Sequence, residues 1–114
     1  MSILLADSRC EPVRSDTPGA SQSQIDEFAS QILDWQIVVQ QDVRQLKRVF
    51  VFENFIQALG FTNRVGEIAE VEDHHPALLT EWGRVTVTWW THVVEGLHRN
   101  DFIMAAKTDR LHSS

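Results

Sequence analysis

Two adjacent histidines are the residues of this sequence best suited to chemistry. His74 and His75 lie in the stretch EVEDHHPALLTEW, after several acidic residues and directly before Pro76, and a third histidine, His92, lies in WWTHVVEGL. Glu70 precedes His74 by four positions, so the two share a face if the helix continues that far. A hairpin after Pro76 would return His92 to the neighbourhood of the first two. We therefore expect three imidazoles and a carboxylate at one end of a sheet.

This cluster has three interpretations. In the structural one, His74 and His75 end a helix, where partial positive charge suits the dipole, and His92 is an ordinary strand-end residue. Three histidines with Glu70 would also suit zinc, although adjacent histidines rarely face one ion. In the third, imidazoles with pKa values near about 6.5 act as acid and base around a bound ligand. Spacing alone ranks the structural interpretation first and the acid–base site second.

The elements that position these residues follow from apolar periodicity and turn signals. Residues 1–22 contain prolines, a glycine and serines without an apolar period, which predicts a flexible lead-in, and residues 23–114 are expected to form one domain. The predicted elements are a helix over about 23–33, strands over 35–40 and 43–52, a helix over 53–72, strands over 78–82 and 84–92, and a helix over 98–111. The order αββαββα indicates an α+β fold, a four-stranded antiparallel sheet with three helices on one face.

Composition narrows the class of protein. A chain of 114 residues fits one core, and its net charge of -6 argues against direct nucleic-acid binding. Cys10 is the single cysteine, so no intramolecular disulfide can form and a reducing compartment is expected. We read Cys10 as an incidental thiol in a mobile tail. Neither a signal peptide nor a membrane span is evident, so we expect a cytoplasmic protein that does not bind a membrane.

The combined pattern resembles the signature of the pterin-4a-carbinolamine dehydratases. The matching residues are Glu70, His74, His75, Pro76, Trp82, Thr91, His92, Gly96, Leu97 and Asp101. The resemblance covers about residues 25–111. Within it, the stretch HHPALLTEWGRVTVTWWTH resembles bacterial members that accompany phenylalanine hydroxylase. This chain departs from the pattern at Ala77 and Leu78, where many members have other apolar residues, and at Asn100, where some members have arginine.

The resemblance implies an activity and a role for each residue. Family members dehydrate 4a-hydroxytetrahydropterin to quinonoid dihydropterin and water, so the pterin is the substrate and no further cofactor or metal is expected. His74, His75 and His92 would form the acid–base and pterin-contacting set, with the acid and the base unassigned. Glu70 would orient an imidazole, and Pro76 and Trp82 would wall the pocket. Thr91 and Asp101 would support His92, or Asp101 would cap the last helix.

A protein-interaction module is the rival class, because some family members also serve as transcriptional cofactors. We also expect a homodimer or homotetramer. Sheet edges need cover, and the long helix carries apolar residues around much of its circumference, with Phe61 and Val65 turned away from Phe55 and Leu59. Gly60 and Gly66 would let a partner helix approach closely. A functional link to phenylalanine hydroxylase follows from the resemblance alone.

Overall fold

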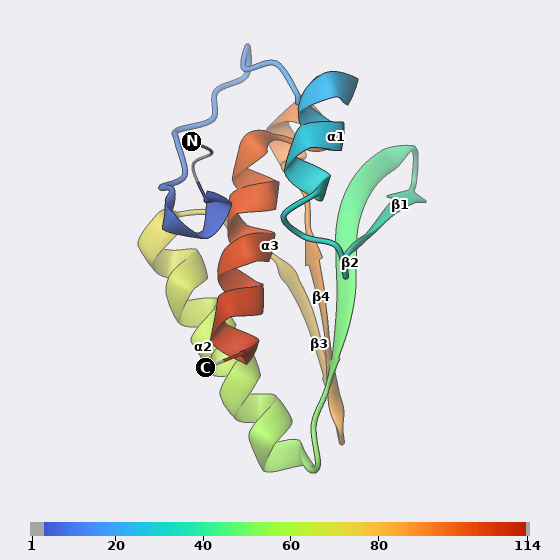
Figure 1. Cartoon of the computed structure of the whole chain (residues 1–114), viewed down its shortest axis with the longest axis vertical. Helices are drawn as coiled ribbons and strands as arrows, with labels where there is room; N and C mark the ends of the chain where they lie inside the picture. The colour runs from blue at the N-terminus through green and yellow to red at the C-terminus, as the bar shows by residue number, and fades with distance from the viewer. Residues whose placement is uncertain (1–3, 114) are drawn as a thin grey trace.

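The predicted α+β architecture is confirmed in the computed structural model, which describes residues 4–113. Figure 1 shows the α-helices on one side of a single sheet. The elements are a 3₁₀ turn η1 (Leu5–Asp7), α1 (Gln22–Ala29), β1 (Gln36–Gln40), β2 (Val43–Val51), α2 (Phe55–Glu72), β3 (Ala77–Glu81), β4 (Arg84–Trp89), a 3₁₀ turn η2 (His92–Val94) and α3 (Arg99–His112). All neighbouring strands are antiparallel, in the order β1-β2-β4-β3.

Alternation along the central strands builds the core. Val85, Val87 and Trp89 of β4 are completely buried, whereas the intervening threonines are partly exposed. Leu46 and Phe50 of β2 face the same core. Because side chains in a strand alternate between faces, this pattern directs one face of the sheet towards the helices.

The long helix presents two different faces. Phe61 and Val65 are completely buried in the core. Phe55 and Leu59, which were predicted to lie on a different face of the helix, are exposed. Ile56 on the opposite face is 76% exposed. A Cβ atom at Gly66 would have no neighbouring atom of the chain within 4 Å, so this glycine is not needed for close packing of one helix on another within the chain.

Two element ends differ from the sequence prediction. The first helix ends at Ala29 rather than near Leu33, because the Ser30 hydroxyl donates to the Glu27 carbonyl at 2.7 Å and the chain turns. The last strand ends at Trp89 rather than His92. Thr91 then pairs with Gly96 in an isolated bridge around the η2 turn, which removes His92 from the sheet.

The predicted lead-in makes contacts that its composition did not indicate. Leu5 is 3% exposed, and the Lys107 ammonium of α3 donates to the Ala6 carbonyl at 3.0 Å. Figure 1 shows this segment running beside α2 and α3 before it reaches α1. No helix among residues 4–113 is long and apolar enough to cross a membrane.

Candidate active site

His74 is aimed into the molecule by the way α2 ends. Asp73 has the left-handed φ of 53°, and the His74 amide donates to the Ala69 carbonyl at 3.1 Å. This is a Schellman ending, which reverses the chain after the helix. The His74 side chain is only 10% exposed as a result, and its ring stacks on the Trp89 indole with centroids 5.8 Å apart.

A buried carboxylate fixes the His74 ring. Asp101 is completely buried, and its Oδ1 lies 2.6 Å from His74 Nε2. Its Oδ2 accepts from the Thr91 hydroxyl at 2.8 Å and from the His98 amide at 2.9 Å. Because carboxylate oxygens accept hydrogen bonds, we assign the His74 ring proton to Nε2, which then donates to Asp101 Oδ1. His74 Nδ1 is then the nitrogen that can exchange a proton with a ligand.

Asp101 therefore performs both of the roles considered from sequence. It completes a capping box with His98 at the start of α3, because its side chain accepts from the His98 amide. It also supports a histidine, but that histidine is His74 and not His92. Thr91 acts on the same carboxylate, and is itself 4% exposed.

The other two histidines face solvent. His75 follows His74 directly, and its Nε2 lies 3.5 Å from Glu70 Oε1, with side chains 54% and 80% exposed. The imidazole that Glu70 approaches is therefore His75 and not His74, with which the helical spacing suggested a shared face, and water can screen the gap between them. His92 opens the η2 turn and is exposed.

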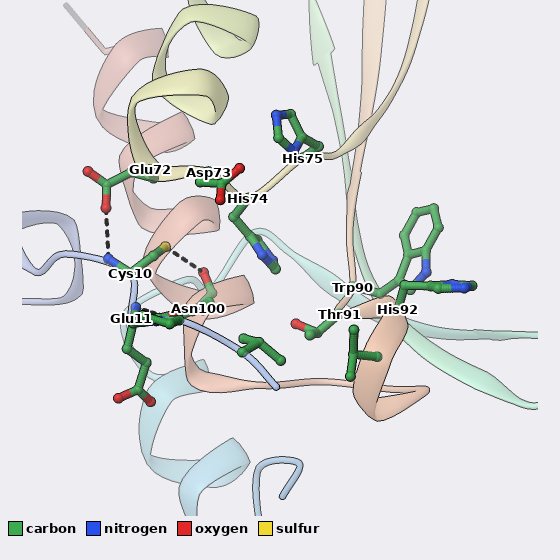
Figure 2. A pocket seen from close by; sticks show the side chains of 13 residues that line it. Cys10, Glu11, Glu72, Asp73, His74, His75, Trp90, Thr91, His92 and Asn100 are labelled. Atoms are coloured by element: carbon green, nitrogen blue, oxygen red, sulfur yellow. Dashed lines mark hydrogen bonds between the residues drawn. The ribbon is translucent and has the colours of Figure 1, made fainter. Parts of the chain in front are cut away.

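These residues border one pocket of about 700 Å³. Figure 2 shows the His74 ring pointing into it from the segment after α2, with His75 and His92 at its rim and Cys10 and Glu11 on the side opposite His92. The lining residues are Cys10, Glu11, Pro12, Val13, Glu72, Asp73, His74, His75, Trp90, Thr91, His92, Val93 and Asn100. Asp101 lies beneath this surface through its bonds to His74 and Thr91.

Not every predicted site residue lies here. Trp82, expected to wall the pocket, is 72% exposed in the turn between β3 and β4, at the end of the hairpin away from the histidines. It borders a different hollow with Val51 and Phe52. Pro76 is partly buried and separates His75 from β3, so it shapes the approach to the strand without bordering the pocket.

Sequence reasoning missed Asn100 and the segment of residues 10–13, here termed the N-terminal wall, which lines one side of the pocket. Residues 10–13 show no periodicity that would have revealed them. Trp90, Glu72 and Asp73 could have been found, because they flank the predicted histidines directly. Cys10 is partly buried, and burial together with nearby Glu72 raises the pKa of its thiol to about 12. The thiol is therefore protonated and unreactive at neutral pH.

The arrangement suits proton transfer better than metal binding. Within residues 4–113, no three His, Cys, Asp or Glu side chains are placed to hold a metal ion together. What the site offers is an imidazole hydrogen-bonded to a buried acid, with two exposed imidazoles at the rim of the same pocket. Such a set can donate one proton and accept another at a bound heterocycle.

Comparison with known proteins identifies the family of this chain. A crystal structure described as a transcriptional coactivator/pterin dehydratase from Brucella melitensis is 31% identical, with a TM-score of 0.75 over 82% of this chain and 98% of that one. A pterin dehydratase-like protein described as a RuBisCO assembly factor in the alpha-carboxysome is 21% identical, with a TM-score of 0.59 over 71% of this chain and 92% of that one, and shows the shared fold alone. The model of the pterin 4 alpha carbinolamine dehydratase family matches residues 18–111. The chain therefore belongs to the pterin 4 alpha carbinolamine dehydratase family.

Proposed function

We propose that this protein dehydrates a 4a-hydroxytetrahydropterin to the quinonoid dihydropterin and water. The observation that carries the proposal is the Asp101–His74 pair, with 2.6 Å between Oδ1 and Nε2, set beneath a pocket that His75 and His92 also border. Family membership supports the same chemistry, and the substrate would come from a hydroxylation that uses a tetrahydropterin, such as that of phenylalanine.

The reaction needs two proton transfers. The C4a–O bond breaks and the hydroxyl leaves as water when an acid protonates it, while the neighbouring ring nitrogen loses its proton and the C=N bond forms. His74, held by Asp101, and the exposed His75 and His92 supply one donor and one acceptor. Each such transfer is worth about 10²–10⁴-fold in rate. Glu70 would bias the orientation of the His75 ring.

The test is a dehydration assay on freshly generated 4a-carbinolamine. We expect folded protein to accelerate loss of the carbinolamine above the buffer rate, and we expect a chelator to leave this rate unchanged. A rate equal to buffer, from protein with a cooperative melt, would remove the enzymatic proposal. Activity lost to chelator, with near-stoichiometric zinc in the sample, would replace the acid–base mechanism with a metal-dependent one.

A protein-interaction role is the second candidate, and one surface favours it. The outward face of α2 exposes large apolar side chains, which are Phe55, Ile56, Leu59 and Val71. Exposed apolar patches mark contact sites. We propose that a second copy of the chain covers this face. An interaction module without catalysis would keep its binding after replacement of His74, His75 and His92 together, whereas the enzyme would lose turnover.

A further inference from the structure

Two consecutive tryptophans lie where β4 ends, and they lie on opposite sides of the chain. Trp89 is completely buried, and its ring stacks on the His74 imidazole with the two planes 9° apart. Thr91 also points towards the helices, because its hydroxyl donates to the buried Asp101 carboxylate. Side chains alternate along extended backbone. Trp90, between these two inward residues, therefore lies on the other side, where it borders the pocket.

Trp90 differs from the two core tryptophans in having no polar or aromatic partner. The indole N–H of Trp35 donates to Asp109 at 2.8 Å, and that of Trp89 donates to Thr108 at 3.3 Å. Trp90 is partly exposed, and within residues 4–113 its indole forms neither a hydrogen bond nor a ring contact. An indole is apolar on its faces and carries one donor at its edge. In Trp90 both are left for a ligand.

Trp90 also brings the largest flat apolar surface to the pocket. Figure 2 shows it beside His92, across the pocket from Cys10 and Glu11. The other aliphatic or aromatic hydrocarbon side chains in the described lining are Pro12, Val13 and Val93. Each of these is much smaller than an indole. A flat ligand in the pocket therefore has one broad apolar surface against which it can lie.

The opposite side of the pocket is held in place by Asn100. This residue is 1% exposed, and its side chain accepts from the Glu11 amide at 3.0 Å and donates to the Glu11 carbonyl at 2.8 Å. Glu72 accepts from the Cys10 amide at 2.7 Å. Paired hydrogen bonds to one residue set its orientation as well as its position. The N-terminal wall is thus anchored to α2 and α3, and it bounds the space across from Trp90.

We propose that Trp90 is a substrate-binding residue whose indole stacks on the flat, conjugated part of the pterin ring. The inference rests on the proposed function. Stacking uses the faces of the two ring systems, so it needs none of the groups that exchange protons. The reacting carbon C4a belongs to the pterin ring. Holding the ring therefore keeps the leaving hydroxyl in the pocket that His74, His75 and His92 border.

The experiment measures the Kd of 7,8-dihydrobiopterin by calorimetry, because this pterin lacks the 4a-hydroxyl and cannot be dehydrated. Trp90→Ala should raise Kd by about tenfold or more, the usual loss when an aromatic side chain stacked on a nucleobase is removed. Trp90→Phe keeps a ring face and should stay within about threefold of wild type. Trp90→Leu keeps apolar volume without a ring and should bind about fivefold or more weakly. The control Trp82→Ala removes an exposed indole outside the pocket and should keep the wild-type Kd.

Steady-state kinetics separate binding from chemistry. Trp90→Ala should raise KM for the carbinolamine by about tenfold and keep kcat within about threefold, because binding lost equally from substrate and transition state leaves kcat unchanged. A kcat that falls with KM unchanged would overturn the binding role. Thermal melting reports whether each variant is folded, and the comparison of Trp90→Phe with Trp90→Leu remains decisive if Trp90→Ala does not fold.

The outcomes separate this inference from the proposed function. Active wild type with the same Kd in folded Trp90→Ala overturns the role of Trp90 alone. Equal Kd values in Trp90→Phe and Trp90→Leu overturn stacking, because a ring face then gives no advantage over apolar volume. Wild type that binds dihydrobiopterin but does not turn over carbinolamine removes the proposed function, and the same series of Kd values still decides the role of Trp90. Wild type that binds no dihydrobiopterin overturns the inference.

Discussion

Replacing Asp101 with asparagine is the sharpest test of the proposed site. The carboxylate meets three partners, His74 Nε2 at 2.6 Å, the Thr91 hydroxyl at 2.8 Å and the His98 amide at 2.9 Å. In Asp101→Asn the amide oxygen can keep the last two. The NH₂ group then faces His74 and donates to Nε2, which moves the imidazole proton to Nδ1. The variant therefore presents the wrong tautomer to the ligand.

The expected magnitudes separate catalysis from folding. Charge-assisted hydrogen bonds are roughly twice as strong as neutral ones, but removing a buried charge also removes its desolvation cost. We expect a net loss of about 1–2 kcal/mol in the free energy of unfolding, or roughly 5 °C in Tm. A domain of ordinary stability, about 5–15 kcal/mol, stays almost entirely folded after such a loss. Turnover should nevertheless fall by roughly 10³-fold, since misdirecting a catalytic imidazole removes its proton transfer.

The assay measures kcat for carbinolamine dehydration beside thermal melting, and ¹⁵N NMR of the imidazole reports which nitrogen carries the proton. Asp109→Asn is the matched control, because Asp109 lies on the same helix and accepts from Trp35 and Arg48 at 2.8 and 2.6 Å. The control should lose stability and keep turnover. Asp101→Asn with turnover within about threefold of wild type, or with the His74 proton still on Nε2, would refute the tautomer argument.

Four further results are expected. His75→Ala and His92→Ala should each lower kcat by about 10²-fold or more with Tm nearly unchanged, because both rings are exposed; a melt that falls with activity would return them to a structural role. Trp82→Ala should leave KM of the dehydration within about twofold, because this side chain is 72% exposed and away from the pocket; a large rise would place it at the site. Burial lowers the pKa of His98, whose Nδ1 accepts from the Asn100 amide, so its contribution to stability is present above the unfolded pKa and is lost as pH falls through the folded one. Chemical denaturation should therefore show the stability gap between wild type and His98→Gln shrinking from pH 7 towards pH 5, and a constant gap would contradict this linkage. Sedimentation equilibrium at micromolar concentration should give a homo-oligomer, and a mass fitting one 13.1 kDa chain would show that the apolar face of α2 stays uncovered.

The fold was predictable because its signals are local. Gln41 and Asp42 both adopt positive φ, as a tight hairpin turn requires, and the expected turn lies at these two residues. Asn54 caps α2 with its side chain, accepting from the Gln57 amide at 2.9 Å. Apolar alternation likewise predicted the strand over 84–92, within which β4 lies. The wrong predictions concern the ends of helices and strands. There a single side-chain hydrogen bond, such as that from the Ser30 hydroxyl to the Glu27 carbonyl, can end the element a few residues early.

The site was predictable in membership and less so in geometry. Spacing predicted that the histidines would lie together, whereas the family resemblance implied that Asp101 would support His92 or cap the last helix. The partner changed because the left-handed turn at Asp73 directs His74 inward, whereas η2 directs His92 outward. Because Asp73 and not a glycine adopts the left-handed conformation, the residue type does not reveal the turn in the sequence. The N-terminal wall depends on long-range bonds from Asn100, which neither local propensity nor periodicity can register.

The motif residues divide into those that folding requires and those that it does not. Asp101 caps α3, Thr91 binds Asp101, and His74 packs on Trp89, so a family member without catalysis would still gain stability from all three. His75 and His92 have no comparable packing role, because both are exposed, and the one ion-pair contact of His75 is with an exposed glutamate. An exposed imidazole contributes little to folding. The proposed proton transfer gives both a role beside the anchored His74 that folding does not, and this distinction favours the proposed enzyme over the interaction module.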